Sequence, residues 1–563
     1  MSKKSLFVIS FLFIALLHKG NAQTKPDVVD FINREHQWVD SVFKRLSKKE
    51  RIAQLFLVRT HTNLGQEYID SVAKVLRKEK LGGIVVFQGG PVRTAQMINR
   101  YQEAAKVPLL VAIDGEWGLG MRFPDSTISY PYQMALGAIQ DDHLLYTMGQ
   151  QVAKDFLRLG INFNFAPVVD VNNNPNNPVI NFRSFGEDAP NVARKGEAYM
   201  LGMVNGGLLT TLKHFPGHGD TDVDSHHDLP VLPFSKQRLD SLEMYPFKQM
   251  IYAGTPGIMV AHMNIPSLDS TEHLPSSLSK SIISDLLKMD LGFRGLAVTD
   301  AMNMKGVVKF FPDGEADVLA FIAGNDLLEL SENSKRAIKM VEKAIKKKRL
   351  DRDDLDRRVK KVLAAKYWLG LQQPTPVDTL GLYQALNSDS AKALVQQLAD
   401  ASMTMLRGDA DSLNTSLRTA IISIGVDTTP VFQQELKATY PQADMIYVRP
   451  EADIEEINEG LRLVAAGNYE QLIVSIHDQR LRPQSKLNYS EALNRLISEL
   501  DQQNSFFTLF GNPYALSSIP SLTDAKGLLV TYQNDAHMQK AAAKVIAGQL
   551  KATGKLPVSV AGY

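Results

Sequence analysis

The run Lys213-His-Phe-Pro-Gly-His-Gly-Asp-Thr-Asp-Val-Asp-Ser-His-His-Asp-Leu-Pro230 is the stretch from which fold and chemistry can be argued. It holds four histidines and four aspartates, and Pro216 and Gly217 prevent a regular helix. The apolar run Gly207–Leu212 precedes it and is typical of a buried strand. Ionisable groups just past a buried strand are typical of active-site loops in α/β enzymes. The alternative is that these histidines are ordinary loop residues without a chemical role.

The overall composition restricts the class of protein. The chain has 563 residues, more than one core usually accommodates, so two domains are predicted. Hydrophobic residues make up 44% and charged residues 22%, as in an ordinary soluble globular protein. Because the sequence contains no cysteine, it excludes disulfides, thiolate nucleophiles, iron–sulfur clusters and cysteine zinc sites.

Residues 1–22 have the order of a secretory signal peptide. Lys3 and Lys4 precede the apolar run Leu6–Leu17, and small residues before Gln23 offer a cleavage site. The run is too short to span a bilayer, although a membrane-tethering helix is the alternative. We therefore expect an exported protein, periplasmic or extracellular, with no stable membrane insertion after cleavage. Removing residues 1–22 changes the net charge from +1 to −2, so no nucleic-acid partner is expected.

Short apolar runs alternate with helical patterns along residues 23–370. Eight runs are predicted strands, and they are continuously apolar, as expected of a sheet buried on both faces. Their ranges are 52–58, 83–87, 109–113, 161–165, 208–212, 257–261, 295–298 and 326–330. Eight strands with intervening helices predict an α/β fold, with a (β/α)8 TIM-like barrel as the domain at 23–370. A doubly wound sheet is the alternative on strand count alone.

A second α/β pattern follows a predicted linker at residues 371–385, where Gln372-Gln-Pro-Thr-Pro376 is polar and rich in proline. Five predicted strands alternate with helices over residues 386–563 and indicate a smaller α/β/α sandwich domain. No glycine-rich phosphate loop follows its first strand, so no cofactor is predicted there. The chain ends shortly after Gly554-Lys-Leu-Pro557, an ending compatible with a longer native protein.

Polar side chains follow five of the predicted strands in the first domain. Because the carboxyl ends of barrel strands meet at one rim, these groups are expected to build one site. In strand order, the groups are Asp114 and Glu116, Asp170, Lys213 and His214, His262, and Asp300.

Asp300 and the run Asp224-Ser-His226 are the acid–base candidates. Asp300 ends the apolar run Ala297-Val-Thr-Asp300, a position where the alternative is a helix N-cap. A carboxylate at Asp224 can accept a hydrogen bond from His226, fix the ring tautomer and raise its basicity. An imidazole held in this way can donate a proton to a leaving group and later accept one from water.

These motifs resemble the β-N-acetylglucosaminidases (β-N-acetylhexosaminidases) of glycoside hydrolase family 3. The resemblance begins with Lys213-His-Phe-Pro-Gly-His-Gly219 and Asp224-Ser-His226, and four further motifs follow the order of the family. These are Val111-Ala-Ile-Asp114-Gly-Glu116, Phe165-Ala-Pro-Val-Val-Asp170, Arg183-Ser-Phe-Gly186 and Val298-Thr-Asp300. The second domain is similar to the C-terminal sandwich of the family. One departure is Glu116-Trp-Gly-Leu-Gly120, where the family often has Glu-Gly-Gly-Arg; the arginine here comes only at Arg122.

The resemblance implies a retaining exo-enzyme that removes terminal β-linked GlcNAc from glycans such as peptidoglycan fragments or chitooligosaccharides. It implies Asp300 as the nucleophile of a covalent glycosyl-enzyme, His226 as the general acid/base and Asp224 as its orienting partner. It implies that further residues hold the sugar: Asp114, Arg122, Arg183, Lys213 and His214. No cofactor and no metal are implied.

Other functions remain as alternatives. A β-glucosidase of the same family is one, although that branch usually takes its acid/base carboxylate from the second domain; a β-GlcNAc phosphorylase is another. A metal-dependent hydrolase using His214, His218 and His226 is less favoured, because Pro216 and Gly217 break the helix that His-x3-His needs. A non-catalytic sugar-binding protein is the last. The glycines of the loop are interpreted as hinges that let His226 swing over the site.

Overall fold

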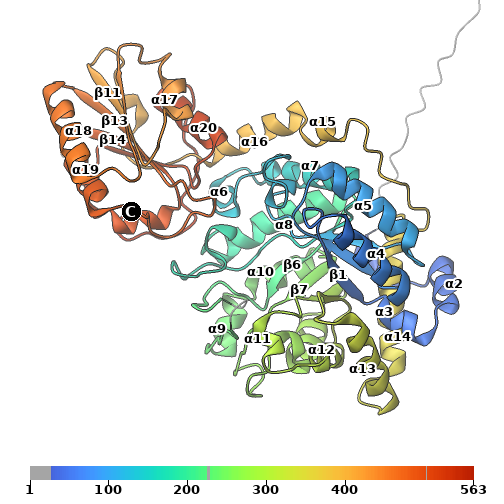
Figure 1. The fold of residues 1–563 in the computed structure, drawn as a ribbon. Helices are drawn as coiled ribbons and strands as arrows, with labels where there is room; N and C mark the ends of the chain where they lie inside the picture. Colours follow the sequence, from blue (N-terminus) through green and yellow to red (C-terminus); the bar gives the residue numbers. More distant parts are fainter. Residues whose placement is uncertain (1–26, 225–227, 502–503) are drawn as a thin grey trace, which may run out of the picture.

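The computed structural model of the protein describes residues 27–224, 228–501 and 504–563 (Figure 1). The predicted signal peptide at 1–22 and the predicted acid/base His226 therefore lie outside the described residues. Within the described ranges, no helix combines the length and the apolar character needed to cross a membrane.

The first part of the chain forms two parallel sheets. The larger has the strand order β5-β4-β3-β2-β1-β9 and the smaller the order β6-β7-β8. A parallel bridge between Val298 of β8 and Leu327, just before β9, links one edge of the smaller sheet to the larger one. A second parallel bridge joins Lys213 of β6, at the other edge of the smaller sheet, to Val168 after β4. The two sheets therefore curl toward each other at both edges. The strands are β1 (Phe56–Thr60), β2 (Gly83–Val86), β3 (Leu110–Ile113), β4 (Phe163–Asn164), β5 (Leu209–Thr210), β6 (Leu212–Phe215), β7 (Gly257–Val260), β8 (Leu296–Thr299) and β9 (Leu328–Glu329).

Helices follow most of these strands and cover them on the outside (Figure 1). Helix α4 is typical: its buried residues Ile69, Val72 and Leu76 recur at helical spacing and form one apolar face. The helices are α1 (Val28–Ile32), α2 (Gln37–Arg45), α3 (Lys48–Ala53), α4 (Gln66–Glu79), α5 (Pro91–Ala104), α6 (Gln133–Ala138), α7 (Asp142–Arg158), α8 (Ala189–Asn205), α9 (Lys236–Ser241), α10 (Tyr245–Tyr252), α11 (Lys305–Val308), α12 (Glu315–Ala323), α13 (Ser334–Lys346) and α14 (Arg352–Trp368). The short helical segments are η1 (Leu119–Met121), η2 (Asn181–Arg183), η3 (Ser276–Leu278) and η4 (Ser281–Asp290).

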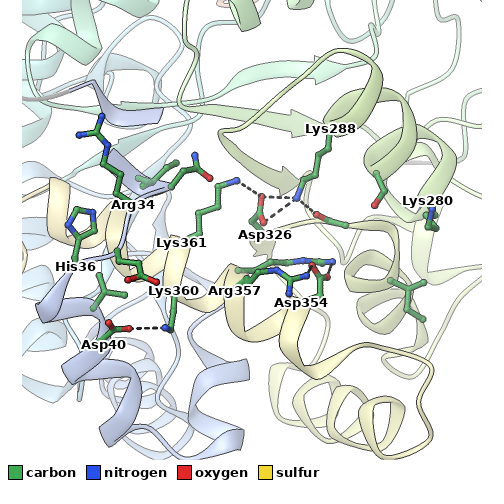
Figure 2. Close-up of a pocket in the computed structure, with 18 residues that line it drawn as sticks. Arg34, His36, Asp40, Lys280, Lys288, Asp326, Asp354, Arg357, Lys360 and Lys361 are labelled. Carbon is green, nitrogen blue, oxygen red and sulfur yellow. Dashed lines mark hydrogen bonds and ion pairs between the residues drawn. The ribbon is translucent and has the colours of Figure 1, made fainter. Parts of the chain in front are cut away.

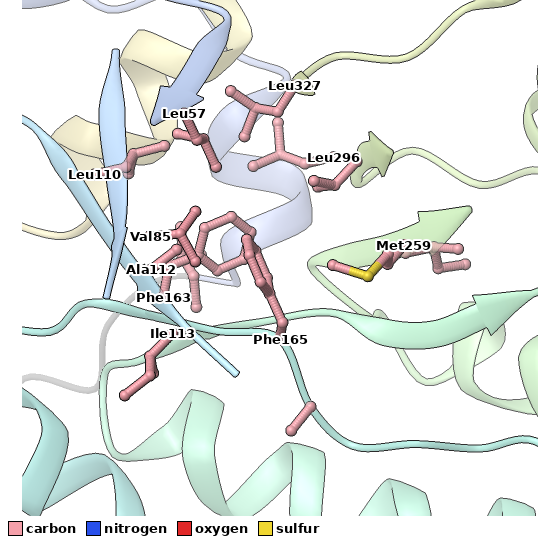
Figure 3. Packing of buried hydrophobic residues seen from close by; sticks show 14 of the residues in the cluster. Leu57, Val85, Leu110, Ala112, Ile113, Phe163, Phe165, Met259, Leu296 and Leu327 are labelled. Carbon is pink, nitrogen blue, oxygen red and sulfur yellow. The ribbon is translucent and has the colours of Figure 1, made fainter. Parts of the chain in front are cut away.

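Apolar side chains from both sheets fill the interior between them. Figure 3 shows Val85 and Phe163 of the larger sheet in the same region as Met259 and Leu296 of the smaller one. Most side chains of β2, β3, β7 and β8 are fully buried, which explains why their sequences are continuously apolar. The predicted α/β class with parallel strands is confirmed.

Two predicted strand positions in this part were wrong in detail. The run 52–58 begins with a helix, because Ser47 and Glu50 form a reciprocal capping box that starts α3 and leaves β1 to begin at Phe56. Lys213 and His214 were expected just past a strand but lie inside β6. The chain pairs with β4 through β5 and with β7 through β6, so the strand continues beyond Leu212.

The second part of the chain forms a separate sheet with the order β10-β15-β14-β13-β11-β12, in which only β10 runs antiparallel to its neighbour. Helices α18 and α19 lie on one side of this sheet and α17 and α20 on the other (Figure 1). The strands are β10 (Thr404–Arg407), β11 (Thr419–Ile424), β12 (Asp444–Val448), β13 (Gln471–His477), β14 (Ser505–Phe510) and β15 (Gly527–Val530). The helices are α15 (Leu382–Leu386), α16 (Asp389–Ser402), α17 (Val431–Leu436), α18 (Ile454–Ala466), α19 (Glu491–Asp501) and α20 (Ala536–Ile546), with short segments η5 (Ala410–Ser412), η6 (Pro513–Ser518) and η7 (Pro520–Asp524).

A cavity of about 700 Å³ lies between α1, α2, α14 and η4, near residues that precede β8 and β9 (Figure 2). Its innermost carboxylate is Asp326, which faces Lys288 at 3.2 Å and Lys361 at 3.6 Å. Burial favours the neutral acid, but the charges of these lysines and of Arg358 lower the pKa of Asp326 to about 2. Asp326 also accepts the backbone N–H of Ala297 at 2.8 Å, so this charged cluster ties the start of β8 to α14 and η4.

Candidate active site

A buried ion cluster joins loops that follow different strands. Lys213 of β6 donates to Asp114, which follows β3, at 2.8 Å, and lies 2.9 Å from Glu116. Glu116 is fully buried and accepts two hydrogen bonds from the guanidinium of Arg183, at 2.6 and 2.9 Å. Arg122 completes the cluster by donating to Asp114 at 2.8 Å. Four of the predicted sugar-binding residues are thereby brought together.

The protonation states in this cluster follow from its geometry. Burial alone would favour neutral acids, but the charges of Arg183 and Lys213 hold the pKa of Glu116 well below its usual value. Lys213 and Arg122 likewise lower the pKa of Asp114. Burial would lower the pKa of Lys213, yet Asp114 and Glu116 raise it overall. The cluster is therefore fully ionised at neutral pH, with fixed charges that can orient hydroxyl groups.

Asp170, in the loop after β4, anchors the start of the histidine-rich run. Its carboxylate accepts the backbone N–H of His214 at 3.1 Å, the ring Nδ1–H of His214 at 2.8 Å and the backbone N–H of His218 at 2.7 Å. Burial opposes ionisation, but His214 and His218 lower the pKa of Asp170. This carboxylate thus fixes the orientation of the predicted sugar-binding residue His214.

The glycines of the loop have a packing role that the hinge interpretation missed. A Cβ on Gly219 would lie 1.8 Å from the carbonyl oxygen of Val171, so only glycine fits there. Gly217 has a φ of +133° and faces Glu243, whose Cβ would lie 2.7 Å from an added Cβ. Both positions need glycine for close backbone packing, and residues 217–219 are held against their neighbours.

His218 is buried in this loop and is neutral at pH 7. Burial, followed by the nearby charge of His214, lowers the pKa of His218 to about 4. Its Nδ1 lies 2.7 Å from the hydroxyl of Thr221, and its backbone carbonyl accepts from Asn177 at 2.9 Å. These contacts give His218 a structural role in shaping the loop.

Asp300 follows β8 directly and is partly exposed. Its backbone N–H donates to Val260, and its Oδ1 accepts the N–H of Ala301 at 2.7 Å. Burial raises the pKa of the Glu329 carboxyl, and the charges of Asp114 and Asp300 raise it further. The charges of Asp300 and Asp114 therefore both act on Glu329.

Asp224 is half-buried at the end of the described part of its loop. Its backbone carbonyl accepts the N–H of Asp228 at 3.2 Å. The carboxylate of Asp228 pairs with Lys309 at 3.1 Å, in the segment that follows Asp300. Asp228, the first described residue after Asp224, thus contacts the chain beyond Asp300.

The second sheet region supports the loop that presents Arg183. Asn181 donates to Ser485 at 2.7 Å and accepts from Asn512 at 2.6 Å. Tyr132 donates to the carbonyl of Leu481 and packs against Trp117 with a ring separation of 4.9 Å. The second part of the chain therefore stabilises one side of the site.

Several residues of the site were missed as functional candidates by sequence reasoning. Glu116 and Asp170 were noted only as rim residues, and their partners Arg183 and His214 lie 67 and 44 positions away in sequence. Glu329 lay within the last predicted strand, 326–330, and was not considered as a site residue. An acidic residue near the carboxyl end of that apolar run was the sequence feature that could have identified it. His262 bonds to Ser277 at 2.6 Å and to the carbonyl of Ala301 at 3.1 Å, where it supports the turn after Asp300.

In the described ranges, no three His, Asp or Glu side chains are arranged to hold a metal ion.

Comparisons with known proteins identify the relatives of this chain. The family model "Glycosyl hydrolase family 3 N terminal domain" matches residues 47–365. A beta-hexosaminidase A from Pseudoalteromonas piscicida is 30% identical over 542 residues, covering 87% of this chain and 91% of the relative. A beta-N-acetylglucosaminidase/beta-glucosidase from Cellulomonas fimi is 25% identical, covering 92% and 95%. The solved structure of a family 3 beta-N-acetylglucosaminidase from Paenibacillus sp. str. FPU-7 is 30% identical, with a TM-score of 0.75 and coverage of 92% and 99%.

The family model spans more than half of the chain, and the Pseudoalteromonas relative is aligned along nearly all of its own length. Ionised groups from loops after different strands also converge at one site, as a carbohydrate-cleaving enzyme requires. The chain therefore belongs to glycosyl hydrolase family 3 and is a glycoside hydrolase acting on a carbohydrate substrate.

Proposed function

We propose that the protein is a retaining exo-β-N-acetylglucosaminidase that hydrolyses terminal β-linked GlcNAc from peptidoglycan fragments or chitooligosaccharides. The observation that carries the proposal is Asp300 at the carboxyl end of β8, whose charge acts on the buried Glu329, as does the charge of Asp114 in the ion cluster of Lys213. The names of the Pseudoalteromonas relative and of the Paenibacillus structure support the choice of an N-acetylated sugar.

In the first step, the carboxylate of Asp300 attacks the anomeric carbon while the bond to the glycosidic oxygen breaks. His226, oriented by Asp224, donates its proton to that oxygen and the alcohol leaves. The ion pair between Asp228 and Lys309 supports this assignment, because Asp228, two positions after His226 in sequence, contacts the segment that follows Asp300. The fixed charges of Asp114, Arg122, Lys213 and Arg183, with His214, orient the sugar hydroxyls.

In the second step, water attacks the anomeric carbon of the glycosyl–Asp300 ester. His226 accepts the water proton, the bond to Asp300 breaks, and both side chains return to their starting protonation states. Two displacements at one carbon retain the β-configuration of the sugar.

The substrate class can be decided with two aryl glycosides. We expect the wild-type protein to cleave p-nitrophenyl β-GlcNAc with a kcat/KM at least about tenfold above that for p-nitrophenyl β-glucoside, since a hydrogen-bonded acetamido group contributes about 1–3 kcal/mol. The rates should be the same with and without inorganic phosphate. Faster cleavage of the glucoside would favour the β-glucosidase alternative, and a phosphate-dependent rate that yields sugar 1-phosphate would favour the phosphorylase.

The role of His226 is tested through the leaving group. His226→Ala should lower kcat/KM for phenyl β-GlcNAc by about 10²-fold, because this alcohol needs a proton to depart. The same variant should cleave dinitrophenyl β-GlcNAc at nearly the wild-type rate of glycosylation, because that leaving group departs as an anion. Equal losses on both substrates would contradict the acid/base assignment, and the exposed residue His273, changed to alanine, is the control.

We further propose the domain plan predicted above: a (β/α)8 barrel at 23–370, a linker at 371–385 and an α/β/α sandwich at 386–563. The strand order of the two curled sheets and the helices on both sides of the third sheet support it. The signal-like order of residues 1–22 supports export to the periplasm or the outside of the cell.

A further inference from the structure

Glu329 is a buried acid whose backbone is hydrogen-bonded to the residues before and after Asp300. It is the last residue of β9 and is 3% exposed. Its backbone N–H donates to the hydroxyl of Thr299 at 3.1 Å. Its carbonyl accepts the N–H of Met302 at 2.8 Å. Since Thr299 and Met302 flank Asp300 in sequence, these bonds fix Glu329 relative to the proposed nucleophile.

The carboxyl group of Glu329 differs from the other buried acids of the site. Among the described residues, no donor and no cation is bonded to its oxygens, whereas Asp114, Glu116 and Asp170 each accept two or more hydrogen bonds. A buried acid without a partner is costly as an anion and therefore favours its neutral form.

Four charged residues from different segments of the chain act on Glu329. Asp114 follows β3 and Asp300 follows β8, while Lys213 on β6 and Arg122 after η1 are the cations that act on Glu329. Burial raises the pKa of Glu329 well above its usual value, and the negative charges of Asp114 and Asp300 add to this effect. Lys213 and Arg122 oppose the shift, but both cations already bond to Asp114.

We infer that Glu329 is a further binding residue of the glycosidase site, a neutral carboxylic acid that donates its proton in a hydrogen bond to a hydroxyl of the bound sugar. The inference rests on the proposed function of Asp300. A neutral donor holds the sugar without adding a further negative charge near the nucleophile, which must itself be ionised to attack. Because the protein supplies no partner within its described residues, the substrate supplies it.

The protonation state is tested by infrared difference spectroscopy at pH 7 on the full-length enzyme. The spectrum of wild type minus Glu329→Gln should contain the C=O stretch of a carboxylic acid, and this band should shift in D2O. Glu116→Gln is the matched control, because Glu116 is also a buried glutamate but is held ionised by Arg183 and Lys213. Its difference spectrum should contain carboxylate bands instead. Carboxylate bands in the Glu329 difference spectrum would overturn the inference.

The hydrogen bond is tested by comparing two variants on p-nitrophenyl β-GlcNAc. Glu329→Gln keeps a neutral donor and should lose less than about tenfold in kcat/KM, while Glu329→Leu should lose about 10²-fold, the equivalent of a lost substrate hydrogen bond. Equal kcat/KM values for the two variants would overturn the binding role. If the wild type is inactive on this substrate, or Asp300→Ala is active, the proposed function fails instead, so the two failures are distinguishable.

Discussion

Replacing Asp300 by alanine is expected to lower kcat/KM for p-nitrophenyl β-GlcNAc by a factor of about 10⁴ or more. The size follows from the mechanism, because no covalent intermediate forms without the carboxylate and a lost nucleophile typically costs this much or more. Asp300 is partly exposed and follows β8 at its end, so the alanine variant should keep its fold. Steady-state kinetics and a thermal melt monitored by circular dichroism measure both properties.

The control for Asp300 is Asp313→Ala, which removes an exposed carboxylate thirteen residues further along the chain. This variant should have wild-type kinetics. A covalent GlcNAc-based inhibitor that keeps the 2-acetamido group, such as a 5-fluoro glycosyl fluoride, should label a peptide that contains Asp300 in the wild type, and no label should appear in Asp300→Ala. Near-normal turnover by Asp300→Ala, or a label on another carboxylate, would exclude Asp300 as the nucleophile.

Replacing Lys213 by methionine is expected to damage both stability and activity. Lys213 is 2% exposed, and its ammonium group is shared by the partly buried carboxylate of Asp114 and the buried carboxylate of Glu116. Without it, Asp114 keeps Arg122 and Glu116 keeps Arg183 as the cationic partners among the described residues, and breaking a buried ion pair costs about 3–5 kcal/mol. Without Lys213, the carboxylates of Asp114 and Glu116 are no longer held in place to orient the sugar, so kcat/KM should fall by about 10³-fold.

Lys366→Met provides the matched control for Lys213→Met. Lys366 is also completely buried, but its ammonium group donates to the amide oxygen of Gln54 at 2.7 Å, and burial lowers its pKa to about 7. Removing it leaves no carboxylate without a cation, so the loss of stability should be smaller and the kinetics should stay at wild-type values. Chemical denaturation gives the free energies of unfolding. Equal losses of unfolding free energy in the two variants would mean that the ion pairs of Lys213 add no stability beyond the packing of its side chain.

The sequence by itself determined the α/β class, the family and most of the catalytic candidates. Continuous apolar runs reveal buried parallel strands because both faces of such strands are covered. A polar residue directly after such a run is expected at the carboxyl end of a strand, as Asp300 is after β8, although Lys213 and His214 lie inside β6. The assignment of apolar runs to strands was wrong for the first part of 52–58. There the capping box of Ser47 and Glu50 starts helix α3, which includes the apolar residues Ile52 and Ala53.

The tertiary structure alone decided which charges meet and which stay uncompensated. Lys213 and Asp114 are separated by 99 positions in sequence, yet they are bonded, and no spacing pattern predicts such a pair. The same holds for Arg183 and Glu116, whereas Glu329 is buried without a bonded cation among the described residues. Protonation depends on burial and on charges within a few ångströms, and both arise only when distant segments pack together. The sequence therefore supplied the ionisable groups, and the packing of the strand ends assigned the charge that each of them carries.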